Sequence, residues 1–400
     1  MSDAPPPPTP LPATQTTFAV YAGPPLDSIK TMVATEFHIA DAFLDPYGIP
    51  TVQVTREPAK EKFQRLLDQL RQQGLIAAIR GPRGSGDVLT IKIFQKPTPK
   101  PPRRMINLVL FLATILTVFV AGYLLWLAQL QQGFIQTVVP NSNIYLEAIA
   151  FVAGLVAIIG LHEFGHKAAA RHHKMDATLP YFVPGPPPIG TFGAVISLRS
   201  PPANRDQLFD LGLSGPLVGF VVTIVVIILS VVFGIYLSPA QFQQAQQYGA
   251  SSTDWSAWPF QQPAIAIIVS GLATTLRSET GGAILFDPQL SFAAQIGALL
   301  TFLNLVPMWQ LDGGHISRSV FGEGGHRTST VIGLLILIAA RYYPFAFLVL
   351  AFMLFSRRGF AGVEPLDDVS PVSNSRKLLY FLGLVMLLLT FAVAPPFLSG

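Results

Sequence analysis

The sequence contains no cysteine, which excludes disulfide bonds and any metal site built from thiolates. A bound metal would therefore need ligands from histidine, aspartate or glutamate. Charged residues are also scarce, at 12% of the 400 residues, whereas half of the residues are hydrophobic and the mean hydropathy is +0.48. This composition is typical of an integral membrane protein.

The net charge of +4 and the pI near 9.3 do not indicate a nucleic acid partner, because the basic residues form no patch. They flank two apolar stretches instead, at Lys96, Lys100, Arg103, Arg104, Lys167, Arg171 and Lys174. An excess of Lys and Arg beside membrane spans marks their cytoplasmic ends. We therefore expect the lipid bilayer, and no nucleic acid, as the surroundings of this chain.

Residues 1–16 are rich in proline and nearly uncharged. They lack the basic start and apolar core of a signal peptide and the arginine-rich character of a transit peptide. We predict a disordered tail, partly in the polyproline II conformation, and membrane insertion through the first internal span.

Residues 17–95 predict a small soluble α+β domain. Two segments, Leu26–Phe37 and Ala59–Gln73, have helical spacing of apolar residues. Four short segments have the alternation or composition of strands, namely 18–21, 51–55, 75–79 and 88–94. A ferredoxin-like arrangement is one candidate for this order. The residues of the domain do not indicate its function, and residues 96–104 predict a stiff basic linker.

The remainder, 105–400, predicts a polytopic α-helical membrane domain, since a span needs about 20 apolar residues. The predicted spans lie near 105–127, 145–168, 211–237, 291–311, 329–341, 343–356 and 377–397. Seven spans are predicted, with six as the alternative, because the helices on either side of Arg341 are short and would also suit a re-entrant pair. The soluble domain and the loops 171–210, 312–328 and 357–377 would face the cytoplasm, and the loops 129–144 and 238–290 the other side.

A His-Glu-x-x-His run, His162 to His166, ends the apolar stretch Tyr145–Leu161. On a helix this spacing puts both imidazoles on one face, one turn apart, where they can bind one zinc ion. The intervening Glu163 would lie beside the metal as a candidate general base. Ionisable residues inside a membrane segment are costly, so they indicate function.

Two histidines do not complete a catalytic zinc site, which usually has three protein ligands and a water. Asp312 is the main candidate for the third ligand, because it ends the fourth predicted span at the same depth as His162 and His166. Gly313 and Gly314 behind it would let the backbone approach a metal. The alternative is an aspartate that only terminates a helix.

With these motifs the chain resembles the site-2 intramembrane metalloproteases, a family with bacterial, archaeal and plant plastid members. The resemblance covers about Met105 to His326 in the expected order. It rests on His162-Glu163-x-x-His166, Asn304-x-x-Pro307-x-x-x-x-Leu311-Asp312-Gly313, Gly190-Thr-Phe-Gly193-Ala194 and Ser214-Gly215-Pro216. One departure is Gln310, where the family often has proline.

The resemblance implies that His162, His166 and Asp312 bind one zinc ion per chain. Glu163 would accept a proton from the attacking water and pass it to the leaving amine. Asn304 would stabilise the tetrahedral intermediate. Because Asn304 precedes Asp312 by slightly over two helical turns, both are expected on the same helix face. The alternative for Asn304 is a hydrogen bond between helices.

Residues 179–200 are too polar and too rich in proline and glycine for a helix. Gly190, Gly193 and the alternation over Ala194–Leu198 predict a β-hairpin that enters the membrane beside the metal. Its exposed edge could pair with an unwound substrate; an ordinary cytoplasmic loop is the alternative. Ser214–Pro216 is expected to allow close helix packing without a chemical role.

The other histidines carry weaker signals. His172 and His173 are expected to form an interfacial cationic cluster with their basic neighbours. His315 is expected in a turn, with a place behind the metal ligands as the alternative. His38 and His326 belong to no pattern.

Together these features predict a zinc-dependent endopeptidase that cuts a transmembrane segment of a membrane-anchored protein. A metal-binding transporter and an inactive protease-like scaffold are the alternatives. We expect an integral protein of the cell membrane, with the N-terminal domain and the active site toward the cytoplasm. The sequence indicates neither the substrate nor the oligomeric state.

Overall fold

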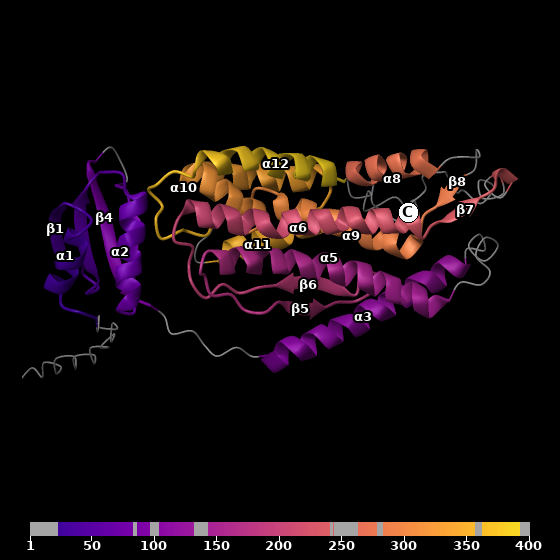
Figure 1. Cartoon of the computed structure of the whole chain (residues 1–400), viewed down its shortest axis with the longest axis horizontal. Helices are drawn as coiled ribbons and strands as arrows, with labels where there is room; N and C mark the ends of the chain where they lie inside the picture. The colour runs from indigo at the N-terminus through magenta and orange to yellow at the C-terminus, as the bar shows by residue number, and fades with distance from the viewer. Residues whose placement is uncertain are drawn as a thin grey trace, which may run out of the picture. The chain divides into compact units, whose positions relative to one another are not determined.

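The computed structural model describes residues 23–82, 86–96, 104–131, 143–240, 243, 263–277, 283–356 and 362–392. The chain divides into two compact units, Met1–Thr98 and Pro99–Gly400, and Figure 1 labels most of their elements. The predicted tail 1–16, the predicted strand 18–21 and most of the predicted linker 96–104 lie outside the described residues.

The first unit is an α+β unit with one four-stranded sheet. Its elements are α1 (Leu26–Ala34), β1 (Ile39–Leu44), β2 (Pro50–Thr55), α2 (Lys60–Gln72), β3 (Leu75–Arg80) and β4 (Val88–Gln95). All neighbouring strands are antiparallel, in the order β1-β2-β4-β3. A ferredoxin-like unit has a single strand after its second helix, whereas here β4 follows β3 and pairs with β2, so that candidate is wrong.

Alternation along the strands explains the core of this unit. Every second residue of β2, β3 and β4 is buried, and so is the apolar stripe of α2, at Val52, Val54, Leu75, Ala77, Ile79, Leu89, Ile91, Ile93, Phe63, Leu66, Leu67 and Leu70. Sequence alternation did not reveal β1, because four of its six residues are exposed and alanine and aspartate are weak strand formers.

Asp45 shapes the turn between β1 and β2. Its Oδ1 accepts hydrogen bonds from the backbone N–H groups of Tyr47 (2.9 Å) and Ile49 (3.0 Å), and its Oδ2 accepts one from Lys92 Nζ (2.8 Å). The Lys92 ammonium, and then these N–H groups, hold the pKa of Asp45 below its usual range. The turn is therefore fixed by the ionised form of one carboxyl group.

The second unit is mostly helical. Its elements are α3 (Arg104–Gln131), α5 (Ile144–His172), β5 (Tyr181–Pro184), β6 (Thr191–Val195), α6 (Arg205–Val232), β7 (Ile235–Leu237), α8 (Ala264–Arg277), β8 (Ala283–Leu285), α9 (Pro288–Leu305), α10 (Asp312–Ala339), α11 (Tyr343–Phe355) and α12 (Asn374–Thr390). Among the helices described, α3, α5 and α6 are long and apolar enough to cross a membrane, with mean hydropathies of 2.6, 2.3 and 2.7. The protein is therefore an integral membrane protein, while the count of seven spans stays a prediction.

Three predicted boundaries in this unit need correction. The helix predicted over 291–311 ends at Leu305, and Asp312 is the first residue of α10 rather than the last of the preceding span. The segment 312–328, predicted as a cytoplasmic loop between two spans, is helical apart from the non-helical Gly322 (φ 70°). The predicted loop 238–290 contains α8 and β8, and β8 pairs with β7. The predicted break near Arg341 is present between α10 and α11.

Helices α5, α6 and α9 pack against one another, and the β5–β6 hairpin lies between α3 and α5 (Figure 1). Asn107 of α3 donates hydrogen bonds to the carbonyl oxygens of Leu179 (3.1 Å) and Pro180 (2.9 Å) at the base of the hairpin. Near the turn of the hairpin, Thr117 Oγ1 of α3 donates to the carbonyl oxygen of Gly190 (2.7 Å). The hairpin predicted over 179–200 is therefore present and attached to α3 near both ends.

Ion pairs connect the helices that surround the site. Arg318 of α10 is buried and forms a bidentate pair with Asp368 (2.9 and 2.6 Å). Arg376 of α12 pairs with Asp210 of α6 (2.8 and 2.6 Å), and His173 Nε2 lies 2.8 Å from the same carboxylate. His173 therefore joins α5 to α6 through Asp210.

Replacing Asp45 with asparagine is expected to destabilise the first unit near neutral pH. Because the folded state lowers the pKa of Asp45, the stabilisation is present above about pH 4 and is lost as the pH falls through the folded-state pKa. In the full chain, β1 and β2 amides should exchange hydrogen faster in Asp45→Asn than in the wild type at pH 6. The difference should shrink at pH 3.

The matched control is Asp41→Asn, which changes an exposed carboxylate of the same strand region. It should leave the exchange at pH 6 unchanged. Equal exchange rates in Asp45→Asn and the wild type at pH 6 would show that the carboxylate does not stabilise the turn.

Candidate metal centre

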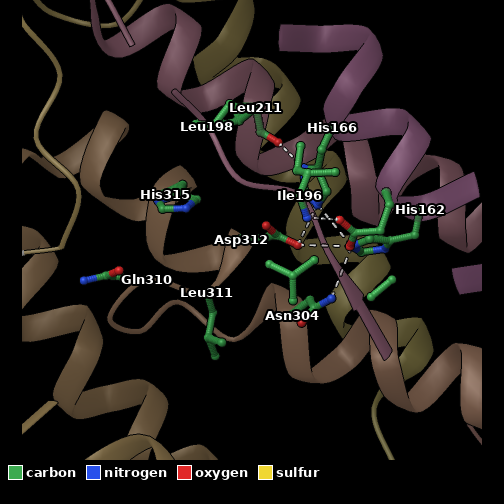
Figure 2. Close-up of a pocket in the computed structure, with 13 residues that line it drawn as sticks. His162, His166, Ile196, Leu198, Leu211, Asn304, Gln310, Leu311, Asp312 and His315 are labelled. Carbon is green, nitrogen blue, oxygen red and sulfur yellow. Dashed lines mark hydrogen bonds and ion pairs between the residues drawn. The ribbon is translucent and has the colours of Figure 1, made fainter. Parts of the chain in front are cut away.

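Three ligand atoms from two distant parts of the chain converge at one point. His162 and His166 lie on the buried face of α5, and their Nε2 atoms are 3.1 Å apart. Asp312 Oδ2 lies 3.4 Å from His162 Nε2 and 3.3 Å from His166 Nε2. Figure 2 shows the carboxylate of Asp312 pointing at both rings. The structure thus brings together the three residues predicted to bind one metal ion.

The spacing of these atoms fits a zinc ion. In a tetrahedral site with bonds of about 2.0–2.1 Å, ligand atoms lie about 3.3–3.4 Å apart. The three observed separations are 3.1, 3.3 and 3.4 Å. Two imidazole nitrogens and one carboxylate oxygen are also a donor set that zinc accepts. The residues present therefore fit one metal ion.

The tautomer of His166 supports the same assignment. Its Nδ1 lies 2.8 Å from the carbonyl oxygen of Leu211 in α6, and a carbonyl oxygen can only accept a hydrogen bond. Nδ1 therefore carries the proton, which leaves Nε2 with a free lone pair directed at the point of convergence. Histidine ligands of metals are commonly oriented in this way by a second partner.

Asp312 and Asn304 reach the site through a reversal of the chain. Asn304 is in the last turn of α9, and its Nδ2 lies 3.3 Å from His162 Nε2. Asp312 starts α10 after the non-helical segment 306–311. The expectation that Asn304 and Asp312 share one helix face is wrong, because they belong to two helices. They still meet, because the two helix ends lie on the same side of His162.

Glu163 is buried beside the two histidines, and the hairpin holds one of its oxygens. Its Oε2 accepts a hydrogen bond of 2.8 Å from the backbone N–H of Ile196, the residue that follows β6. The Glu163 side chain also lines the cavity next to the ligand atoms. A buried carboxylate that lines the cavity next to the ligand atoms, with one oxygen fixed, is suited to accept a proton.

A cavity of about 390 Å³ gives access to these groups. Its walls come from α5, the hairpin, α6 and the junction of α9 and α10. It is lined by His162, Glu163, His166, Ala194, Val195, Ile196, Leu198, Leu211, Asn304, Gln310, Leu311, Asp312 and His315. All five predicted site residues therefore line one cavity, and His315 lines it too, on α10 rather than in a turn.

Glycines allow α6 to approach the histidines closely. A methyl group on Gly215 would overlap the ring of His166, and one on Gly219 would lie 2.9 Å from Nδ1 of His162. On α5, a methyl group on Gly165 would lie 2.5 Å from the carbonyl oxygen of Ser214. The sequence predicted close packing at Ser214–Pro216 but did not show that the packed surface is a histidine ring.

Sequence reasoning missed two backbone groups of the site. The carbonyl of Leu211 orients His166, and the N–H of Ile196 holds Glu163. Every residue has such groups, so the identity of Leu211 or Ile196 carries no signal for these roles. Only the alternation of the hairpin pointed to this region of the chain.

Residues 150–340 match the sequence profile of peptidase family M50. Over this segment the chain is similar to peptidase family M50. The segment includes most of α5, the hairpin, α6, α9 and all of α10, which are the elements that contribute to the cavity. The match agrees with the family resemblance indicated by the motifs.

Curated relatives extend the same similarity. The probable chloroplastic zinc metalloprotease EGY2 of Oryza sativa subsp. indica is 28% identical over 252 residues, which cover 60% of this chain and 41% of the relative. EGY2 of Arabidopsis thaliana is 27% identical, over 62% of this chain and 41% of the relative. The probable zinc metalloprotease EGY1 of Oryza sativa subsp. japonica is 25% identical over 78% of this chain and 54% of the relative. The chain thus matches about half or less of the length of these relatives. No solved structure matches the chain significantly.

Gly215→Ala is expected to lower the affinity for metal by about 10–100-fold, which is the usual effect of substituting a residue that orients a histidine ligand. The added methyl group would displace the His166 ring and with it Nε2. Metal titration of the purified protein after chelation measures this. Gly324→Ala is the control, since its methyl group would meet no atom within 4 Å. Unchanged metal affinity in Gly215→Ala would contradict the role of this contact.

Proposed function

We propose that this protein is a zinc-dependent endopeptidase that hydrolyses a peptide bond within a transmembrane segment of a membrane-anchored protein. The observation that carries the proposal is the convergence of His162 Nε2, His166 Nε2 and Asp312 Oδ2 within 3.4 Å of one another, beside Glu163. The match to peptidase family M50 and the names of the relatives as zinc metalloproteases support the same chemistry.

In this proposal His162, His166 and Asp312 hold zinc. The bound ion would supply a Lewis acid for the scissile carbonyl and lower the pKa of a water molecule toward about 7. Glu163 accepts the proton of the attacking water on the oxygen that Ile196 does not hold. It then donates this proton to the leaving amine nitrogen. Burial of the site keeps competing bulk water away from these groups.

Asn304 is suited to stabilise the negative charge that develops on the substrate. Its side-chain amide lies 3.3 Å from His162 Nε2 and so borders the proposed metal position. An amide N–H aimed at a developing oxyanion stabilises the transition state more than the ground state. We assign Asn304 this role in preference to a purely structural hydrogen bond.

The hairpin offers a surface for an extended substrate. Ala194, Val195 and Ile196 line the cavity, and the N–H of Ile196 points at Glu163. Along a strand, the backbone N–H and C=O groups of every second residue point to the same side. The backbone groups of Ala194 therefore point to the same side as the N–H of Ile196. A peptide unwound from its helix could pair along this edge and place its carbonyl near the ligand atoms.

The helix that carries the site supports a membrane setting. His162, Glu163 and His166 belong to α5, one of the three helices among the described residues that are long and apolar enough to cross a membrane. We propose that the site lies within the depth of the bilayer, that the hairpin enters it, and that the basic loops and the first unit face the cytoplasm of a cell membrane. The whole activity, its substrate and its partners are part of this proposal, because the chain matches only part of its relatives.

Glu163→Gln tests the mechanism, because it keeps the shape of the side chain and removes the base. The purified variant should retain its zinc and cleave a model transmembrane substrate in vesicles about 10²–10⁴-fold more slowly than the wild type. Glu323→Gln, at an exposed glutamate of α10, is the control and should cleave normally. Chelation should stop cleavage, and added zinc should restore it.

The alternatives predict other outcomes in the same vesicles. A metal transporter would move zinc across the membrane without cleavage, and an inactive scaffold would bind substrate and leave it intact. Normal cleavage by Glu163→Gln would overturn the assigned base.

Ile196→Pro removes the backbone N–H that donates a hydrogen bond to Glu163 Oε2. Because a misplacement of about 1 Å can cost 10²-fold in rate, we expect kcat to fall by about tenfold or more while zinc content and KM change little. Ser197→Pro is the matched control. It removes the neighbouring N–H, which donates to Thr178 Oγ1 (3.0 Å) and not to a site residue. Equal effects of the two substitutions on kcat would contradict the positioning role of Ile196.

A further inference from the structure

The exposed apolar side chains of the first unit gather in one turn. Phe43 is 36% exposed, Leu44 54% and Tyr47 64%. Among residues 23–82 and 86–96, these three are the large hydrophobic side chains that are exposed. Single exposed apolar residues are common on proteins, but a cluster confined to five positions indicates a contact surface. We refer to residues 43–47 as the apolar turn.

The apolar turn is rigid rather than loose. Besides its bonds to Asp45 Oδ1, the turn is closed by the backbone bonds Asp45 N–H to Ile49 O (3.0 Å) and Gly48 N–H to Asp45 O (2.8 Å). Gly48 has a φ of 74°, which glycine adopts without strain. The backbone of the turn is therefore fixed, so that binding through it costs little further conformational entropy.

Strand register places the apolar turn at the end of the sheet at which β4 ends and the chain continues to α3. Leu44 pairs with Pro50, and the adjacent Thr51 pairs with Lys92 near the end of β4. Strand β4 ends at Gln95, and the membrane-crossing helix α3 begins nine residues later at Arg104. A chain of that length spans at most about 30 Å. The end of the sheet that carries the apolar turn is therefore also the end that this short stretch of chain joins to α3.

Charge favours the same surface. The tether carries four basic residues and no acidic one over 96–104, at Lys96, Lys100, Arg103 and Arg104. Basic residues next to a span are attracted to anionic lipid headgroups. Tyrosine prefers the interface, where its ring is in an apolar layer and its hydroxyl group reaches water.

We propose that the apolar turn inserts into the headgroup region of the bilayer and so fixes the first unit on the membrane surface. The partner is a lipid surface that contains anionic lipids. This inference does not depend on the proposed peptidase activity. It gives the first unit, whose sequence indicates no function, a membrane-bound surface of its own.

The absence of cysteine allows a direct test on the full chain. A nitroxide spin label is attached to Tyr47→Cys in vesicles of phosphatidylcholine and phosphatidylglycerol. Its collisions with oxygen, which concentrates in lipid, and with a water-soluble nickel chelate are measured. We expect a ratio of oxygen to nickel collisions several-fold higher than for the control Asp87→Cys, an exposed position at the opposite end of the sheet.

The same measurement separates the other occupants. Low collision rates with both reagents would show that protein covers the turn, either a second copy or another part of this chain, and would overturn the proposal. High nickel and low oxygen collision rates would show a turn in water and would also overturn it.

A second variant checks that the apolar side chains, and not the label, cause the insertion. Phe43→Ser and Leu44→Ser are added to the labelled Tyr47→Cys protein. The ratio of oxygen to nickel collisions should fall toward that of Asp87→Cys. Vesicles of phosphatidylcholine alone should give an intermediate ratio, because the basic tether then lacks its anionic lipids. An unchanged ratio in the serine variant would contradict the proposal.

Discussion

The close approach of α6 to the histidine face of α5 is the contact on which the candidate site depends. At Gly215 and Gly219 the backbone of α6 lies directly against the two rings, and the carbonyl of Leu211 fixes the proton of His166. A larger residue at Gly215 would push the ring away and separate the ligand atoms. In an apolar interior an imidazole without a partner is costly. The packing of α6 therefore sets both the position and the tautomer of a ligand.

The part of the site that local geometry determines could be predicted from the sequence. A spacing of four residues on a helix places His162 and His166 on one face whatever the rest of the fold does. Asp312 was predicted for a different reason, since the membrane segments offer few other charged residues, and the structure places its carboxylate beside both histidines. The prediction that Asp312 ends a span was wrong, because the sequence did not show that α9 ends at Leu305 and that Asp312 begins the next helix.

The error over 306–328 has a physical cause. Glycine and charge usually indicate a loop, yet Gly313 and Gly314 are in the first turn of a helix. A methyl group on Gly314 would overlap the carbonyl oxygens of Met308 and Trp309, and one on Gly313 would overlap that of Leu305. These glycines are needed because the backbone of the chain reversal passes close to the start of α10. Such a long-range contact leaves no periodic pattern in the sequence.

The hairpin connects the proposed base to the proposed substrate edge. Its base and turn are bonded to α3 by Asn107 and Thr117, and its last strand leads to Ile196, which holds Glu163. In surroundings without water, breaking such bonds leaves unpaired polar groups, which is expensive. The edge of β6 is therefore a fixed element of the site rather than a mobile loop. Under the proposed function, one rigid strand both orients the carboxylate and receives the peptide, so a substrate that pairs with β6 is aligned with the base without further movement of the chain.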